Sequence, residues 1–496
     1  MINVTVRELA DLLGAELIGP ADEAPDTMLT GLVIDSRQVT AGNLFLALPG
    51  EHVDGHDFVA AAFDNGAVAA LTARPVPEAT GCCLVVADPL AAAGRVARNQ
   101  VDRGTAGGLR VVAITGSAGK TSTKDLLAQL LESVGPTVAP VGNLNNEIGL
   151  PLTVCRIDEA TRYLVAEMGA RGIGHIAYLC TIAPPQVAAV LNVGSAHVGE
   201  FGGQQQIAVA KGEIVEALPV DGVAVLNADD PLVWAMRTRT AARVVATSVS
   251  AEPATDDAVW GSEVDADALG RCAFTLAEKW GGVSSEPVRV RLGMAGRHQV
   301  GNAVAAVAMA RALGAPADSV VAGLAAARSR SRWRMELTER PDGVLVVNDA
   351  YNANPESMRA ALDTVAGVIG ERSQAGAVGW AILGDMLELG SSAPTEHAAL
   401  GAYAARRGIS RLVAIGAFAE EVRAGAEATG AGVTAEVATD RDDAVRRVLA
   451  ELAPGDVVLV KASRGLALET VATALAAAAP ASPVHEPSDE QGEGSA

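Results

Sequence analysis

The sequence is short of positive charge. Its 496 residues include 38 Lys and Arg against 59 Asp and Glu, which gives a formal net charge of −21. An acidic chain is repelled by the phosphates of nucleic acids and by anionic membranes. The composition therefore argues against nucleic acid as a partner, and any anionic ligand has to be held by a local group of cations or backbone N–H donors.

Cysteines and long apolar runs are also scarce. Five cysteines occur without a CxxC spacing, which argues against a disulfide framework or a zinc site and favours reduced thiols. Arg7, Glu8 and Asp11 stand where a signal peptide would need an apolar stretch. The apolar segment 466–479 is short and contains Glu469, so we expect a packed helix there and no membrane insertion. These features predict a cytoplasmic protein.

Hydrophobic residues, at 49%, are plentiful, and the length predicts about three domains. Apolar runs of strand length alternate with Ala-rich segments of helix length, which predicts an α/β fold with parallel sheets covered on both faces. The runs are 110–115, 163–168, 187–193, 223–227, 344–348, 380–383, 412–415 and 457–460.

Residues 103–108 are rich in Gly, and residues 325–332 consist mainly of Ala, Arg and Ser, which is typical of segments between domains. Near its end the sequence is acidic and poor in apolar residues. We therefore expect three domains followed by a disordered acidic tail. The predicted ranges are a smaller α/β domain at 1–106, a central parallel-sheet domain at 107–328, a Rossmann-like domain at 329–480 and the tail at 481–496.

The segment 109–133 contains the most informative motif. An apolar strand leads into the turn GSAGKTS and then into a helix with leucines on one face. Backbone N–H groups at such a turn bind phosphate oxygens, a lysine bridges the outer phosphates and a hydroxyl ligates magnesium. A tight turn with a surface lysine is the alternative. The motif is of the short TGxxGKT kind, and its residues are Gly116, Ser117, Ala118, Gly119, Lys120, Thr121 and Ser122.

Two further polar residues follow apolar strands. Glu167 lies in AEMGA and His197 lies in GSAHVGEFG, at the sheet edge where such folds collect ligands. Taken singly, each residue has an equally good structural explanation. Glu167 could be a salt-bridge partner at the end of a strand, and His197 could be a loop histidine with a hydrogen-bond partner in the protein. A phosphate loop alone also fits a nucleotide-dependent switch that makes no product.

The order of motifs along the chain resembles the Mur ligase family, from the N-terminus to Ala478. DAYNANP and GDMLELG are typical of the branch that adds D-alanyl-D-alanine, and the segment 35–58 resembles the uridine-nucleotide module of that branch. The motifs are TGSAGKTSTK, GNLNNEIGLP, AEMGA, NVGSAHVGEFG, AKGEI, NADDP, GRHQVGN, NDAYNANPESM, ILGDMLELG and VKASRG.

The resemblance implies a three-domain, ATP-dependent amide ligase of peptidoglycan precursor synthesis. The γ-phosphate of ATP would pass to the terminal carboxylate of UDP-MurNAc-tripeptide, and the amine of D-alanyl-D-alanine would attack the acyl phosphate. A ligase for another carboxylate, of the folylpolyglutamate type, is the alternative within the superfamily. The sequence does not decide whether the third peptide residue is meso-diaminopimelate or lysine. We expect a monomer, although no sequence feature addresses oligomeric state.

By the same resemblance, five residues would serve the phosphoryl transfer. Lys120 would stabilise the transferred phosphoryl group, Thr121 and Glu167 would hold one Mg²⁺, and His197 would help to hold a second. Lys211 would be carbamylated and act as a metal ligand. A helix-surface lysine is the alternative for Lys211.

The remaining expected contacts surround the two substrates. Asn302 would contact adenine and Arg334 a phosphate, with Trp333 where the family has glycine. Asp349 and Asn352 would approach ATP from the third domain.

The muropeptide would be bound by Ser36 and Arg37 at its nucleotide end. Asn143, Asn145 and Asn146 would present amides to its sugar and peptide part. The asparagine-rich turn could instead serve its own backbone geometry.

Overall fold

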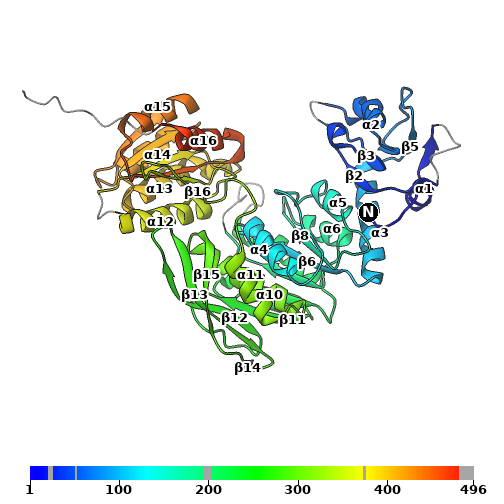
Figure 1. Ribbon diagram of the computed structural model, residues 1–496, viewed down its shortest axis with the longest axis horizontal. Coiled ribbons are helices and arrows are strands. Elements are labelled where there is room, and N and C mark those ends of the chain that lie inside the picture. The colour runs from blue at the N-terminus through cyan, green and yellow to red at the C-terminus, as the bar shows by residue number, and fades with distance from the viewer. Residues whose placement is uncertain (20–25, 51–52, 195–202, 373–375, 480–496) are drawn as a thin grey trace, which may run out of the picture. The chain divides into compact units, whose positions relative to one another are not determined.

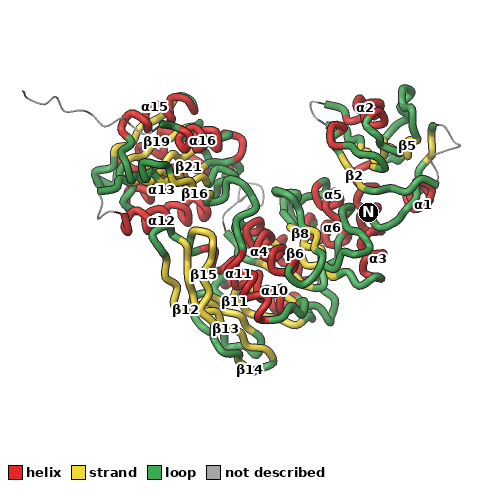
Figure 2. The backbone as a smooth tube through the Cα atoms, viewed as in Figure 1, coloured by secondary structure: helices red, strands yellow, loops and turns green. Residues whose placement is uncertain are grey.

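The computed structural model describes residues 1–19, 26–50, 53–194, 203–372 and 376–479 (Figure 1). The predicted tail at 481–496 and His197 lie outside these ranges. Contacts divide the chain into two units. The first holds residues 1–334, 354–360 and 388–392, and the second holds the remainder of the described chain. Three sheets flanked by helices confirm the α/β prediction (Figure 2).

The first sheet has the order β1-β5-β4-β3-β2, with β1 antiparallel and the other strands parallel. Helix α3 begins at Pro89 after the N-cap Asp88 and continues to Ala106, so most of the segment 103–108 is helical. Gly104 lets α3 pack closely on Leu109, since a Cβ there would lie 2.8 Å from the leucine side chain. The elements are α1 Val6–Leu13, β1 Glu16–Ile18, β2 Gly31–Val33, η1 Ser36–Gln38, β3 Asn43–Leu46, η2 Gly55–Phe58, α2 Val59–Asp64, β4 Ala69–Thr72, β5 Cys82–Val85 and α3 Pro89–Ala106.

The second sheet, also in the first unit, has the order β14-β13-β12-β11-β10-β9-β6-β8-β7, with β15 paired to β13. Strands β6 to β12 are parallel, as predicted for the runs that form β6, β8, β9 and β10, whereas β13, β14 and β15 are antiparallel. The strands are β6 Arg110–Thr115, β7 Thr137–Val138, β8 Tyr163–Glu167, β9 Val187–Val190, β10 Val223–Asn227, β11 Arg243–Ser248, β12 Ala258–Ala266, β13 Arg271–Trp280, β14 Val283–Ser284 and β15 Val288–Ala295.

Both faces of the parallel region are covered. Along β6, Val111 and Ala113 belong to a core shared with α5, α6 and α8, whereas Val112 and Ile114 belong to a core shared with α4, α10 and α11. Figure 1 shows α10 and α11 beside α4. The helices are α4 Lys120–Glu132, α5 Gly149–Val154, α6 His175–Ile182, α8 Gln204–Glu216, α9 Pro231–Ala235, η3 Met236–Arg239, α10 His298–Ala312 and α11 Ala317–Ala326.

The third sheet has the order β16-β17-β21-β18-β19-β20, and all its pairs are parallel except β16 with β17. The predicted late helix is α16, which buries Val471 and Leu475. No helix in the described ranges combines the length and apolar composition that a membrane crossing requires. The elements are β16 Glu336–Glu339, β17 Leu345–Asn348, α12 Pro355–Arg372, β18 Gly379–Gly384, η5 Gly390–Ser392, α13 Ala393–Arg406, β19 Arg411–Ile415, α14 Ala419–Glu427, β20 Thr434–Ala438, α15 Arg441–Glu451, β21 Val457–Lys461, η6 Arg464–Leu466 and α16 Glu469–Ala477.

Candidate functional site

The turn between β6 and α4 has the geometry of a phosphate-binding loop. Gly119 precedes the helix with φ +82°, and a Cβ on it would lie 2.4 Å from Oδ1 of Asn302. A side chain at this position would therefore be excluded both by backbone conformation and by space. The structure places Asn302, on α10, directly against the loop.

Asn192 holds the loop in place, a role that the sequence analysis missed. Its side-chain Oδ1 accepts from the N–H of Ala118 at 2.8 Å, and its Nδ2 donates to the carbonyl of Ala118 at 3.1 Å. Its own carbonyl accepts from the N–H of Ser117 at 3.1 Å. Because these two N–H groups are occupied, the donors left for a ligand are those at the start of α4, where the first helical N–H groups lack intrahelical acceptors.

Lys120 folds back onto the loop. Its Nζ donates to the carbonyl of Gly116 at 2.6 Å, and the side chain is half-buried. Burial lowers the pKa of Lys120, the charge of Arg334 lowers it further, and the carboxylate of Glu167 opposes both. The ammonium thus stands within the electrostatic range of a carboxylate and a second cation.

Glu167, at the end of β8, is 1% exposed. Its Oε1 accepts from Nδ2 of Asn145 at 2.8 Å, whereas its Oε2 is buried without a hydrogen-bond partner. Burying a carboxylate oxygen without a partner is costly, and functional sites retain such atoms for ligands.

The asparagine-rich loop serves the protein's own structure at two of its three predicted positions. The Asn145 amide holds Glu167, and Oδ1 of Asn146 accepts from the N–H of Gly149 at 2.9 Å at the start of α5. The side chain of Asn143 is exposed.

Lys211 lies on α8 and is 5% exposed, so the alternative of a helix-surface lysine is wrong. In the described part of the chain its Nζ has no hydrogen bond or ion pair. Burial lowers the pKa of Lys211 well below 10.5, and the charge of Lys120 lowers it further. Its surroundings therefore shift the balance from the ammonium toward the neutral amine, relative to a lysine in water. On the same helix, the Glu213 carboxylate accepts from the N–H groups of Gly174 and Ala177 and so holds the start of α6.

Arg334 reaches the phosphate loop. Its Nη2 donates to Oγ1 of Thr121 at 3.0 Å. The preceding Trp333 has φ +59°, in the left-handed region that glycine adopts without strain. A bulky residue in this region costs about 1–3 kcal/mol.

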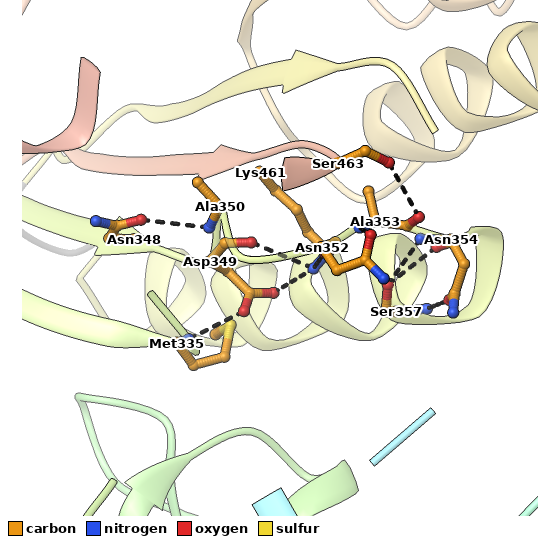
Figure 3. A network of polar contacts seen from close by, with 10 residues as sticks. All are labelled: Met335, Asn348, Asp349, Ala350, Asn352, Ala353, Asn354, Ser357, Lys461 and Ser463. Atoms are coloured by element: carbon orange, nitrogen blue, oxygen red, sulfur yellow. Dashed lines mark hydrogen bonds and ion pairs between the residues drawn. The ribbon is translucent and has the colours of Figure 1, made fainter. Parts of the chain in front are cut away.

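Asp349 and Asn352 belong to a separate cluster in the second unit (Figure 3). Nζ of Lys461 contacts Oδ2 of Asp349 at 2.6 Å and donates to the carbonyl of Asn352 at 2.9 Å. The other Asp349 oxygen, Oδ1, accepts from the N–H of Met335 at 3.0 Å. The buried lysine charge is thus compensated within this cluster.

The sequence analysis missed His397, which contacts the loop that follows strand β18 of the third sheet. Nε2 of His397 accepts from the N–H of Met386 at 2.9 Å, in the GDMLELG motif. The neighbouring Asp385 accepts from the N–H groups of Ala417 and Phe418 at 2.8 and 3.0 Å. No spacing in the sequence indicated that His397 would pack on this loop.

Ser36 and Arg37 form the short helix η1 beside the first sheet. The Arg37 guanidinium contacts Asp35 at 2.8 Å and holds the pKa of that carboxyl at about 2. The Arg37 side chain is 87% exposed. Within the described residues, no hydrogen bond links this turn to the phosphate loop.

Comparison with known proteins identifies the family. Three family models match the chain: the Mur ligase middle domain at residues 114–310, the Mur ligase, glutamate ligase domain at 333–464, and the Mur ligase family, catalytic domain at 28–103. The chain belongs to the Mur ligase family. The three matched ranges fall inside the three predicted domains, whose boundaries stay predictions.

Curated Mur ligases resemble the chain over nearly its whole length. A UDP-N-acetylmuramoyl-tripeptide–D-alanyl-D-alanine ligase of Mycobacterium tuberculosis is 45% identical, over 96% of this chain and 98% of the relative. The ligase of the same name from Escherichia coli is 36% identical, over 96% and 99%.

Solved Mur ligase structures share the three-domain architecture. MurF from Acinetobacter baumannii matches with a TM-score of 0.82 and 32% identity, covering 96% of this chain and 99% of that one. MurF from Thermotoga maritima in complex with ADP matches with a TM-score of 0.74 and 28% identity, covering 90% and 97%.

Proposed function

We propose that this chain is the ATP-dependent ligase that joins D-alanyl-D-alanine to UDP-MurNAc-tripeptide. The tripeptide carboxylate takes the γ-phosphoryl group of ATP and becomes an acyl phosphate. The amine of the dipeptide attacks the acyl carbon, phosphate leaves and the amine loses a proton. The products are UDP-MurNAc-pentapeptide, ADP and phosphate. The observation that carries the proposal is a phosphate loop beside Glu167 Oε2, a buried oxygen without a hydrogen-bond partner in the described chain, and beside the buried side chain of Lys211.

The start of α4 binds the ATP phosphates in this proposal. The N–H groups of Gly119, Lys120, Thr121 and Ser122 lie at a helix N-terminus, where the dipole favours anions. Lys120 exchanges the carbonyl of Gly116 for phosphate oxygens, which restore a full ionic partner to its ammonium. Phosphoryl transfer between two anions requires such positive charge to be in place beforehand.

The residues also fit a divalent cation. Glu167 Oε2 is a buried carboxylate oxygen without a partner, and the Thr121 hydroxyl lies at the same loop. Oxygen ligands of this kind are those that Mg²⁺ prefers. Bound there, Mg²⁺ would neutralise charge on the β- and γ-phosphates. His197, proposed for a second ion, lies outside the described residues, and among the residues described no group of three His, Cys, Asp or Glu side chains forms a metal centre.

Lys211 completes this set as a carbamate. The neutral form of its amine can attack carbon dioxide. An N–C bond forms as one C=O π bond gives its electron pair to oxygen, the nitrogen releases a proton to water, and the neutral amine becomes an anionic carbamate. Lys211→Ala should therefore lose activity and recover part of it when short carboxylic acids are added. Full activity of Lys211→Ala without such acids would remove Lys211 from the site.

The other predicted contacts complete the proposal. Asn302, Arg334, Asp349 and Asn352 contact ATP. Arg37 and Ser36 bind the nucleotide end of the muropeptide, and Asn143, Asn145 and Asn146 present amides to its sugar and peptide part. The ligase is proposed to act as a cytoplasmic monomer.

Phosphate release tests the function. Purified protein with ATP and magnesium receives UDP-MurNAc-tripeptide alone, D-alanyl-D-alanine alone, or both. Release that requires both substrates, with pentapeptide as product, supports the ligase. Constant ATP hydrolysis that is independent of both substrates would instead indicate a nucleotide-dependent switch.

A further inference from the structure

Helix α4 contains a buried ion pair that the proposed mechanism does not use. Nζ of Lys124 lies 2.5 Å from Oδ1 of Asp125, and the two side chains are 2% and 9% exposed. Removing two charges from water is expensive, and a well-packed apolar pair is often at least as stable. Stability alone is therefore a weak reason for this pair.

Lys124 connects α4 to the loop that holds Glu167. Its Nζ donates to the carbonyl of Pro140 at 2.9 Å. The same loop continues to Asn145, whose amide donates to Glu167 Oε1 at 2.8 Å. The lysine therefore fixes one end of the segment that positions the candidate metal-binding carboxylate.

Asp125 connects α4 to the segment 328–334. Its Oδ2 accepts from the N–H of Ser331 at 3.0 Å, three residues before Arg334, which donates to Thr121. The pair thus reaches Arg334 on one side of the phosphate loop and Glu167 on the other.

The segment 328–334 is fastened along one face of α4. Gln129 exchanges two hydrogen bonds with the backbone of Arg328, at 3.0 and 3.1 Å, and Glu132 accepts both ends of the Arg330 guanidinium at 2.6 and 2.5 Å. With Thr121 and Asp125, these helix residues follow the i, i+4, i+8, i+11 spacing of a single face. Thr121 and Asp125 are the buried members of this row.

We propose that Lys124 and Asp125 are positioning residues that set Glu167 and Arg334 relative to the phosphate loop. The inference rests on the proposed function, since it assigns these two groups to the same phosphoryl transfer. Neither Lys124 nor Asp125 touches a substrate. Their effect is on geometry, and a displacement of about 1 Å at a reacting centre can reduce the rate about 100-fold.

Two double variants separate the two connections. Lys124→Met/Asp125→Leu removes both charges, the bond to Pro140 and the acceptor for Ser331. Lys124→Met/Asp125→Asn also removes both charges and the bond to Pro140, but it keeps an oxygen that accepts from Ser331. The matched control is Arg98→Gln/Asp102→Asn, which removes an exposed pair on α3 with a spacing of 2.8 Å.

The experiment measures kcat and KM for ATP and muropeptide, the melting temperature, and amide hydrogen exchange of residues 331–334 and 140–146. We expect the Leu variant to lose about 10- to 100-fold in kcat, with a melting temperature equal to or above wild type. Exchange should accelerate in both segments for the Leu variant, and only in 140–146 for the Asn variant. The control should stay within twofold in kcat and unchanged in exchange.

Three results would overturn the inference. The first is wild-type kcat in a folded Leu variant, and the second is wild-type exchange in both segments. The third is a variant with a lowered melting temperature whose kcat returns to the wild-type value when the assay temperature is lowered by the same amount. That result would indicate a purely structural role. If the Leu variant does not fold, the Asn variant decides by the same criteria at 140–146. Failure of wild type to form pentapeptide would contradict the proposed function instead, while hydrogen exchange would still test the pair.

Discussion

Two buried lysines in different units of the molecule have opposite surroundings. Lys461, in the second unit, contacts the Asp349 carboxylate at 2.6 Å and donates to the Asn352 carbonyl. Lys211, in the first unit, is also buried but has no ion pair or hydrogen bond within the described residues, and the like charge of Lys120 acts on it.

The difference separates structural charges from charges kept for ligands. A buried cation that the fold itself compensates belongs to the architecture, whereas one left uncompensated lowers stability and persists where it serves chemistry. Glu167 Oε2 is likewise a buried group that the fold leaves without a compensating partner. The first unit therefore contains an incomplete electrostatic site, and the second contains a complete one.

Among the variants considered, Lys120→Ala should cause the largest loss of kcat. It should also differ most clearly from a variant of Lys461, which should affect stability. Loss of a preorganised positive charge at the transferred phosphoryl group should lower kcat by about 10³-fold. The melting temperature should change little, since the hydrogen bond of Lys120 within the described residues goes to a loop carbonyl. Steady-state phosphate release and a thermal melt on the same sample test this, and substantial residual turnover would place the phosphate elsewhere.

Lys461→Met should show the opposite behaviour, with a loss of stability. It leaves the Asp349 carboxylate buried beside the Met335 N–H without its cation, and breaking a buried pair costs about 3–5 kcal/mol. Urea unfolding monitored by circular dichroism measures the free energy of unfolding. An unchanged free energy of unfolding would mean that the ion pair of Lys461 does not stabilise the fold, which would contradict the contrast with Lys211.

Lys211→Met should raise stability in a pH-dependent way. The pKa of Lys211 is lower in the folded state than the ordinary value of 10.5 in the unfolded chain. At a pH between these two pKa values the unfolded chain binds one more proton, and this proton binding favours unfolding. The gain from Lys211→Met should vanish as pH approaches 10.5 and should grow as pH falls from 10.5 toward the lowered pKa of the folded state. The measurement is the unfolding free energy of both proteins across pH in carbonate-free buffer. A gain independent of pH would contradict an uncompensated charge.

Arg37→Ala should have the smallest effect. Its ion pair with Asp35 is exposed, and solvent screening leaves such pairs with little effect on stability. We expect a severalfold higher KM for UDP-MurNAc-tripeptide, with kcat and the KM for ATP unchanged. A normal KM would move the uridine-nucleotide contact away from this turn.

The sequence indicated β6, β8, β9, β10, β17, β18, β19 and β21 because their apolar runs are continuous and buried on both faces. It missed β11, β12, β13 and β15. Buried and exposed residues alternate along part of β15, and polar or charged residues shorten the apolar runs of the other three. It found the residues of the phosphate loop, since a local motif carries that information.

Long-range partners could not be predicted in the same way. The bond from Asn145 to Glu167 spans 22 positions, and the contacts of Asn192 with the loop span 74. Neither leaves a local pattern in the sequence. The conformation of Trp333 was likewise unpredictable, because a glycine-like φ at tryptophan arises from surrounding contacts and not from local preference.

A crystal structure with a non-hydrolysable ATP analogue and magnesium tests the central claim most directly. The account predicts the β- and γ-phosphates at residues 119–122, Nζ of Lys120 moved from the Gly116 carbonyl to phosphate oxygen, and Glu167 Oε2 on the metal. A nucleotide bound elsewhere, with Lys120 still on Gly116 and Glu167 Oε2 still without a partner, would contradict it.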